Sequence, residues 1–317
     1  MIIEMSDTTT SEIGRRLVQV REEGGAIALG RVLTLIIAMD GDFDEAAVAA
    51  ANRASGEHPM RVIALHRSDP GADRARIDAE IRVGAHAGAG EVVVLHVSGP
   101  AGEDPDTLVQ ALLLPDAPIV CWWPRSVPEA PGRTPLGRLA QSRIVDTGCA
   151  SRPDEVLERL RGSFTPGDGD LAWTRITLWR AQLAAVLDQA PYEPVRAVEV
   201  HGRPGSSSAL LMAAWLRLLL DAPTRLLIGD EALPCGNSGL GSVRLERGSG
   251  AVRLARTSDA VLSLHLPDHA PQPIPMPVRD LTDLLSEELR SLAPDRVLQE
   301  VLERGVPLLS APGRASS

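Results

Sequence analysis

Lysine is absent from this chain of 317 residues, so all 32 of its basic residues are arginine. The absence excludes chemistry that depends on a lysine amine, namely the Schiff-base lysine, the lysine general base and the P-loop lysine that contacts nucleotide phosphates. Aromatic residues are also scarce, because the chain contains only five Trp, one Tyr and two Phe. Each cluster of aromatic residues is therefore a candidate for a special role.

Cysteine, excess positive charge and long apolar runs are lacking as well. Three cysteines, Cys121, Cys149 and Cys235, lie far apart, a pattern that predicts reduced thiols in a cytoplasmic protein. The net charge of −10 argues against nucleic acid or an anionic membrane as a partner, since both require a concentrated basic surface. No apolar run approaches the roughly 18 residues that span a bilayer. The N-terminal residues do not have the basic start and apolar stretch of a secretory signal.

Sequence motifs of catalysis and metal binding are also missing. No predicted strand is followed by G-x-G-x-x-G, and the chain contains neither a G-x-S-x-G elbow nor a cysteine nucleophile signature. The seven histidines form no H-E-x-x-H motif and no short Cys/His cluster. We therefore expect no cofactor and no metal, and these absences together argue against an enzyme.

Two α/β units are predicted from the hydrophobic patterning and the chain length. In the first half, continuous apolar runs such as residues 31–39 and 91–97 alternate with helices, which predicts a mostly parallel, Rossmann-like sheet covered on both faces. Residues 78–83 alternate in polarity and are predicted to pair with residues 91–97. In the second half, a β-α-β pattern precedes three alternating segments, which predict an antiparallel meander in a second α/β (α+β) domain.

Prolines and polar linkers mark the predicted domain boundaries. We expect an N-terminal α/β domain over residues 1–150 and a helical connector over residues 151–193. A C-terminal α/β domain is expected over residues 194–309, followed by a disordered tail over residues 310–317.

Residues 168–194 hold two of the five Trp and the single Tyr, and they are predicted to form one long helix with two faces. One face is an apolar stripe. The neighbouring face carries Asp170, Trp173, Thr177 and Arg180 at spacings of three, four and three residues. A large aromatic framed by an acid, a hydroxyl and a guanidinium is typical of an interface anchor. The alternative stays open that an aspartate caps the helix while both Trp fill a core.

Polar side chains follow the strands of the predicted parallel sheet, where open α/β sheets bind ligands. Asp40, His66, His96 and Arg125 would all be delivered to this crevice, a set suited to a small anionic ligand. Ordinary solvated loops would look the same. Trp122 and Trp123 end one strand and point to opposite faces, so at least one is predicted near the surface as a second anchor. The alternative is that each Trp covers one face of the sheet.

Long strings of residues in a fixed order carry a family resemblance. They are TTTSEIGRRLVQVREEGGAIALGRVLTLII (8–37), IDAEIRVGAHAGAGEVVVL (77–95), LLLPDAPIVCWWP (112–124), PLGRLAQSRIVD (135–146) and, more weakly, VRLERGSGAVRLAR (243–256). In these strings the chain resembles, over nearly its whole length, the actinobacterial OpcA family of glucose-6-phosphate dehydrogenase assembly proteins.

The resemblance implies a non-catalytic protein that binds glucose-6-phosphate dehydrogenase, promotes its active oligomeric form and activates it. Such activation would support NADPH supply through the oxidative pentose phosphate pathway. The family has no catalytic residues to carry over. The leading prediction is therefore a cytoplasmic allosteric activator that contacts its partner through the Trp173 stripe and the Trp122–Trp123 pair. The alternative is a sensor or enzyme for a sugar phosphate or nucleotide, with its ligand in the strand-end crevice.

Overall fold

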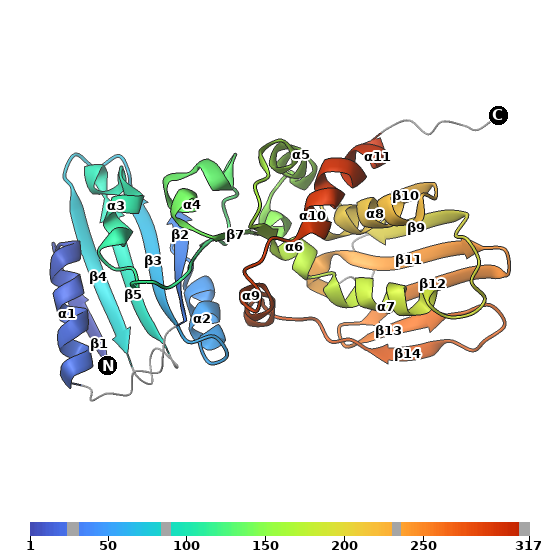
Figure 1. The fold of residues 1–317 in the computed structure, drawn as a ribbon, viewed down its shortest axis with the longest axis horizontal. Helices are drawn as coiled ribbons and strands as arrows, with labels where there is room; N and C mark the ends of the chain where they lie inside the picture. The colour runs from blue at the N-terminus through green and yellow to red at the C-terminus, as the bar shows by residue number, and fades with distance from the viewer. Residues whose placement is uncertain (24–31, 84–89, 230–235, 311–317) are drawn as a thin grey trace. The chain divides into compact units, whose positions relative to one another are not determined.

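The computed structural model describes residues 1–23, 32–83, 90–229 and 236–310, which fold into two compact units whose segments interleave along the chain (Figure 1). Unit 1 comprises Met1–Asp146, Gly167–Gly169 and Leu281–Pro294, and unit 2 comprises Thr147–Pro166, Asp170–Asp280 and Asp295–Ser317. The predicted connector over residues 151–193 therefore forms part of unit 2, apart from three residues. Most of the tail predicted to be disordered lies outside the described residues.

Unit 1 contains the predicted parallel sheet, and its five central strands β5, β3, β2, β6 and β7 all run parallel. Strand β2 comes first in the chain among these five, and the later strands lie on both sides of it. The chain reverses its direction of growth between β2 and β6, which makes this position the topological switch point. In sheet order the eight strands are β1 (Ile2–Met5), β4 (Arg76–Val83), β5 (Glu91–Ser98), β3 (Met60–Asp69), β2 (Leu33–Asp40), β6 (Ile119–Trp123), β7 (Ser142–Val145) and β8 (Asp168–Asp170).

Continuous apolar runs explain why these strands occupy the centre of unit 1. All of β2 except Asp40 is buried, because helices cover both faces of a parallel sheet. The predicted pairing of residues 78–83 with residues 91–97 is confirmed by the antiparallel register of β4 and β5. The helices of unit 1 are α1 (Thr10–Glu23), α2 (Glu45–Ala54), α3 (Pro105–Gln110), α4 (Pro135–Leu139) and α9 (Leu281–Leu289), and its short 3-10 turns are Gly99–Gly102 and Pro131–Arg133.

Unit 2 contains the predicted antiparallel meander in a second sheet. Strands β9 and β10 pair in parallel, and every other neighbouring pair in this sheet is antiparallel. The proline-rich residues 267–277 hold one further strand, β14, at the edge of this sheet. In sheet order the six strands are β10 (Thr224–Ile228), β9 (Ala197–Gly202), β11 (Leu240–Arg247), β12 (Gly250–Ser258), β13 (Val261–His265) and β14 (Gln272–Pro275).

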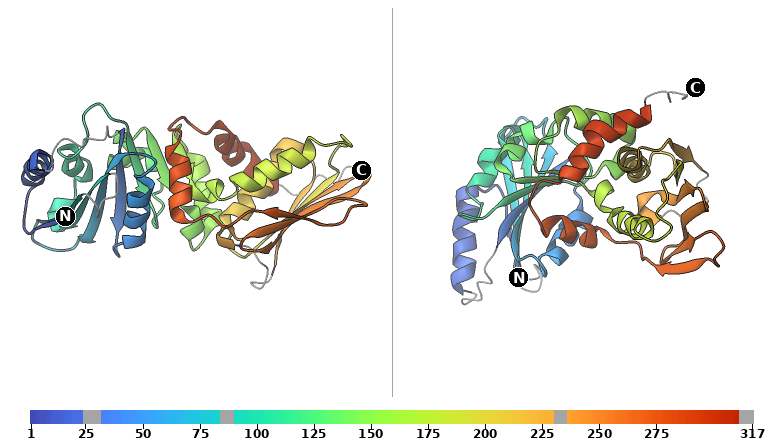
Figure 2. Two further views of the ribbon diagram at one scale, coloured as in Figure 1. Left: turned by 90° about the horizontal axis from the view of Figure 1, so that it is seen from below. Right: turned by 45° about the vertical axis from the view of Figure 1, so that its right-hand side comes forward.

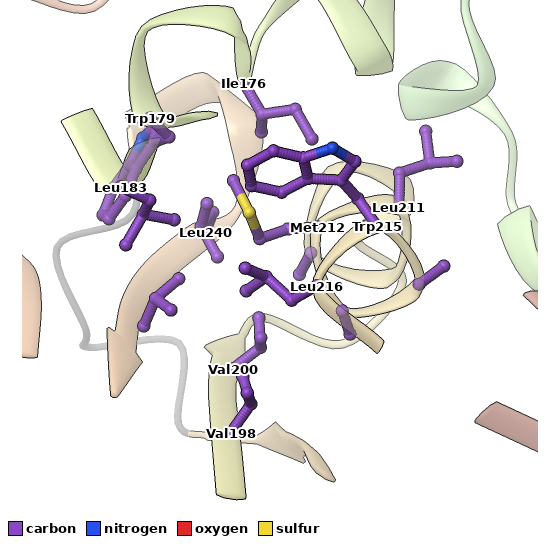
Figure 3. Packing of buried hydrophobic residues seen from close by; sticks show 14 of the residues in the cluster. Ile176, Trp179, Leu183, Val198, Val200, Leu211, Met212, Trp215, Leu216 and Leu240 are labelled. Atoms are coloured by element: carbon purple, nitrogen blue, oxygen red, sulfur yellow. The ribbon is translucent and has the colours of Figure 1, made fainter. Parts of the chain in front are cut away.

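The core of unit 2 lies between one face of this sheet and the helices that cover it (Figures 2 and 3). Trp179 and Leu183 of α7 meet Met212 and Trp215 of α8 above the inward-facing valines of β9. The helices of unit 2 are α5 (Pro153–Ser163), α6 (Leu171–Thr174), α7 (Thr177–Leu187), α8 (Ser207–Leu220), α10 (Arg296–Glu300) and α11 (Val306–Ser310), with 3-10 turns at Thr147–Cys149 and Gly236–Ser238 and a π-helical turn at Val301–Gly305.

The prediction of a single helix over residues 168–194 is wrong, because the segment contains β8, α6 and α7. Asp170 is extended and its side chain accepts a hydrogen bond from Ala172 N, so it begins α6 as an N-cap. The chain leaves helical geometry at Ile176, whose φ of −100° and ψ of 7° separate α6 from α7. The sequence Thr174-Arg175-Ile176-Thr177 is rich in β-branched residues, which lowers its helix propensity at this break.

Candidate functional site

The carboxyl edge of the parallel strands at the switch point is rich in carboxylates. Asp40 ends β2 and forms an exposed ion pair with Arg67, with 3.3 Å between Oδ1 and Nη1. Arg125, which follows β6, donates from Nε to Asp44 Oδ2 at 2.6 Å. The other oxygen of Asp44 accepts from Ala47 N at 3.1 Å and caps α2. Asp40 and Arg125 therefore do not pair with each other. Each forms an ion pair with another residue at this edge of the sheet.

His66 and His96 are brought together at this edge by the parallel register of β3 and β5. Their Nδ1 atoms lie 2.8 Å apart, and His66 Nε2 lies 2.6 Å from the carbonyl oxygen of Gly41. A carbonyl oxygen only accepts, so His66 Nε2 carries a proton. The short distance between the two Nδ1 atoms then requires one proton between them, because two donors would repel and two acceptors would form no bond.

This hydrogen bonding leaves one imidazole nitrogen of the pair available to a ligand. Both nitrogens of His66 are occupied, whereas His96 Nε2 has no partner in the described ranges. Burial and then the neighbouring charge of His66 lower the pKa of His96 below its ordinary value, while Asp78 and Glu80 act in the opposite direction. His96 is therefore mostly uncharged at neutral pH, which weakens its attraction for an anionic ligand.

Phe43 lies in the loop that follows the first parallel strand, β2, which is where dinucleotide-binding folds carry their glycine-rich loop. In a G-x-G-x-x-G loop that began at Gly41, the second glycine would stand at position 43, where the backbone approaches a pyrophosphate. Here the Phe43 ring instead lies 5.4 Å from the His66 ring and 5.1 Å from the His96 ring, measured between centroids. The neighbouring carboxylates of Asp42, Asp44 and Glu45 add negative charge at the N-terminus of α2, where a phosphate would need positive charge.

Trp122 and Trp123 both lie inside unit 1, with exposed fractions of 0% and 5%. The prediction that at least one of them lies near the surface is wrong. At β6 both faces of the sheet are covered, so each ring of the pair fills the core on its own side. Trp122 Nε1 has no hydrogen-bond partner among the residues that the structure describes.

A second cluster, in unit 2, joins three of the four residues predicted on the helix stripe. Trp173 is 2% exposed and donates from Nε1 to Asp295 Oδ2 at 2.8 Å. The guanidinium carbon of Arg180 lies 3.6 Å from the Trp173 ring centroid, a cation–π contact. Arg180 also donates to Thr177 Oγ1 at 3.0 Å. We call Trp173, Thr177, Arg180 and Asp295 the Trp173 cluster.

Asp170 has a separate structural role near this cluster. Its side chain accepts from Thr147 N at 3.1 Å, from Thr147 Oγ1 at 2.5 Å and from Ala172 N at 2.9 Å. These bonds attach the start of α6 to the turn that precedes α5. Asp170 and Trp173 are thus buried, whereas Thr177 and Arg180 are only half-buried and keep part of their surface accessible.

Sequence reasoning missed Asp295, which is the acid that Trp173 contacts. Asp295 Oδ1 accepts from Val297 N and Leu298 N, both at 2.9 Å, and so caps α10. The sequence signal for this cap is an aspartate directly before an apolar helical pattern. No local pattern could pair it with Trp173, because the two residues are 122 positions apart.

Metal ligands and cysteine thiols could also form part of a site. Within the described ranges, no group of three or more His, Cys, Asp or Glu side chains is arranged to hold a metal ion. Burial raises the pKa of the Cys121 thiol well above its usual value, so this thiol is protonated at neutral pH. Cys149 is exposed, and Cys235 lies outside the described residues. No helix among the described residues is long and apolar enough to cross a membrane.

Comparison with protein families gives two matches that together cover most of the chain. The family model for the N-terminal domain of the glucose-6-phosphate dehydrogenase subunit matches residues 51–162. The family model for the C-terminal domain of the same protein matches residues 166–302. The curated proteins include no significant match to this chain.

Several solved structures resemble the fold weakly. A dehydrogenase from Chromobacterium violaceum has 14% identity and a TM-score of 0.48, over 88% of this chain and 94% of that chain. Glucose-6-phosphate 1-dehydrogenase from Mycobacterium avium has 11% identity and a TM-score of 0.46, over 90% of this chain and 93% of that chain.

Proposed function

Because this chain belongs to the OpcA family of glucose-6-phosphate dehydrogenase assembly proteins, we propose that it is a non-catalytic assembly factor that binds glucose-6-phosphate dehydrogenase and activates it. The single observation that carries the proposal is the pair of family matches, whose ranges include large parts of both units. In this role the protein supports NADPH supply through the oxidative pentose phosphate pathway.

Activation works here by a shift of population. A partner that binds the competent conformation of an enzyme more tightly than the incompetent one increases the competent fraction, and the size of the shift equals the difference in binding free energy. Such an activator needs a complementary surface and does not need catalytic side chains.

The loop between β2 and α2 (residues 41–44), which lies at the switch point of the parallel sheet, supports a non-catalytic role. Phe43 stands where a dinucleotide-binding loop requires its second glycine, and its ring packs on both histidines. The same loop and the first residue of α2 carry the carboxylates of Asp44 and Glu45, and the arginines that contact them, Arg125 at Asp44 and Arg82 at Glu45, are already engaged in these ion pairs. A dinucleotide pyrophosphate would meet both a steric and an electrostatic obstacle at this position.

Among the residues expected from the sequence to contact the partner, burial separates two roles. We assign direct contact to the accessible parts of Thr177 and Arg180 on α7. Trp173 and Asp170, like Trp122 and Trp123 in unit 1, are buried and hold the elements around them in position. Contact by the α7 surface remains a prediction and has its own test.

Mixing the protein with glucose-6-phosphate dehydrogenase is expected to increase dehydrogenase activity and to yield a complex that co-elutes in size-exclusion chromatography. The measurement is initial-rate NADPH formation at fixed dehydrogenase and increasing concentrations of this chain. A saturable increase supports the proposal, whereas unchanged rates together with separate elution would refute it.

A folded Arg180→Ala variant is expected to reach half-maximal activation at a higher concentration. Unchanged activation by this variant would remove the α7 surface from the contact.

The carboxyl edge of the parallel strands supports a second candidate function, a small-molecule sensor, because His66 and His96 meet there with one imidazole nitrogen left for a ligand, as far as the described residues show. The acidic loop makes this candidate the weaker one for phosphorylated ligands. We expect neither NADP nor glucose 6-phosphate to raise the melting temperature of the protein in the absence of a partner. A saturable increase that disappears in a His96→Ala variant would instead establish this edge of the sheet as a metabolite site.

A further inference from the structure

The six-stranded sheet of unit 2 has two different faces. Inward residues such as Val200 of β9, Leu245 of β11 and Leu254 of β12 are fully buried in the core of unit 2. Figure 3 shows Val200 beneath α8. The alternate residues of the same strands form the other face, which in the described part of the chain carries no helix (Figure 2). We call it the outer face, and apart from the small Ala255 its side chains range from half-buried to exposed in β9, β12 and β13.

A row of ionisable side chains crosses the outer face at one level. Strand register aligns one residue from each of five neighbouring strands, in the order Arg225, Glu199, Arg244, Arg253 and His265. Neighbouring strands in a sheet are about 4.8 Å apart, so these five positions span roughly 20 Å. The row therefore crosses five of the six strands of this sheet.

Charge is balanced at one end of this row and unbalanced at the other. Glu199 lies 3.8 Å from Arg225, and Glu246 accepts from Arg244 Nε at 2.5 Å. Arg253 is exposed, has no ion-pair or hydrogen-bond partner among the described residues, and stands directly opposite Arg244 on one side and His265 on the other. Two positive charges directly opposite each other on neighbouring strands, such as Arg244 and Arg253, destabilise a sheet. An acidic group from a partner would remove this repulsion.

The side chains next to Arg253 and His265 in the row are small. Ala251 and Ala255 flank Arg253 along β12, and Ser263 precedes His265 along β13 by two positions. Small residues beside Arg253 leave its guanidinium group open to another protein surface. The arginines of the row also contrast with the net charge of −10 for the whole chain.

We propose that the outer face is a docking surface for an acidic protein surface, with carboxylates of the partner bound by Arg253 and the neighbouring Arg244. Guanidinium groups suit this role because their planar donors bind carboxylates in pairs. The proposal rests on the proposed function, in which the partner is the dehydrogenase. A second copy of this chain is a less suitable occupant, since its own outer face carries three arginines and is not an acidic surface.

Reversing the charge of Arg253 tests the docking surface directly. The measurement is the equilibrium binding of immobilised glucose-6-phosphate dehydrogenase to the full chain at low and at raised ionic strength. We expect Arg253→Glu to weaken binding about tenfold or more at low ionic strength, and Arg253→Gln to lie between it and the unmodified protein. We also expect raised salt to weaken binding by the unmodified protein more than binding by Arg253→Glu, because salt screens the attraction that the variant has lost.

Arg15→Glu is the matched control, because it makes the same charge change at an exposed position on α1 in unit 1. Circular dichroism and thermal unfolding check that all variants fold. Equal affinity of the unmodified protein, Arg253→Glu and Arg15→Glu would overturn the docking surface and leave the proposed function intact. Equal weakening by the two reversals would also overturn it, since the effect would then reflect net charge alone. If the unmodified protein itself does not bind the dehydrogenase, the proposed function fails.

Discussion

Replacing Trp173 by alanine is expected to lower the free energy of unfolding of the protein by about 3–5 kcal/mol. The indole is 2% exposed and belongs to the core of unit 2. Its removal leaves a cavity, deprives the Arg180 guanidinium of its aromatic face and removes the hydrogen bond to Asp295. Urea unfolding followed by circular dichroism measures the loss.

A Trp173→Phe variant separates the contributions of packing and hydrogen bonding. Phenylalanine keeps most of the apolar contact but has no Nε1 donor, so we expect a smaller loss in which the missing hydrogen bond accounts for about 1 kcal/mol. The structural role would be contradicted if Trp173→Ala were as stable as the unmodified protein. If such a stable variant also failed to activate the dehydrogenase, Trp173 would be a direct interface anchor, as the aromatic stripe in the sequence first indicated.

Replacing Arg61 by alanine is expected to cost about 3–5 kcal/mol of stability, because it breaks a buried ion pair in the centre of unit 1. Arg61 Nε lies 2.9 Å from Glu91 Oε2, and the two side chains are only 6% and 1% exposed. Arg61 also donates from Nη1 to the carbonyl oxygen of Leu112 at 2.5 Å. Without the guanidinium, the buried Glu91 carboxylate loses this ion pair. Thermal or urea unfolding provides the measurement.

Two further variants define what this result would mean. Arg76→Ala is the matched control, because it removes a more exposed pair with Asp78 on β4, which solvent screens, and it is expected to change the stability little. The double variant Arg61→Met with Glu91→Leu is expected to recover much of the lost stability, because apolar residues of similar volume avoid burying a charge. If Arg61→Ala cost no more than Arg76→Ala, the burial argument would fail.

Much of the fold follows from local patterns in the sequence. Continuous apolar runs predicted the buried parallel strands, and the polarity of residues 78–83 predicted the pairing of β4 with β5. The exceptions have local causes. Asp170 begins α6 as a cap, and the β-branched residues around Ile176 separate α6 from α7. Strand β14 lies in a proline-rich segment, and prolines are tolerated at a sheet edge where no backbone donor is needed.

The candidate sites were less predictable, because they depend on pairs of distant residues. The ends of β3 and β5 could be located from the sequence, but only the register places the two Nδ1 atoms of His66 and His96 2.8 Å apart. The contact of Trp173 with Asp295 joins residues 122 positions apart. Arg253 has no ion-pair partner among the residues that the structure describes, because the strand register places Arg244 and His265 opposite it.

The amino-acid sequence by itself determined the two α/β units, the absence of lysine chemistry and the family membership, because each depends on local composition, periodicity or strings of residues. Only the tertiary structure decided which aromatic and charged residues are accessible. It buried Trp122, Trp123 and Trp173, and it left Arg253 exposed between two other positively charged or titratable side chains. Accessibility depends on what packs against a side chain, and in a folded chain these neighbours come from distant parts of the sequence.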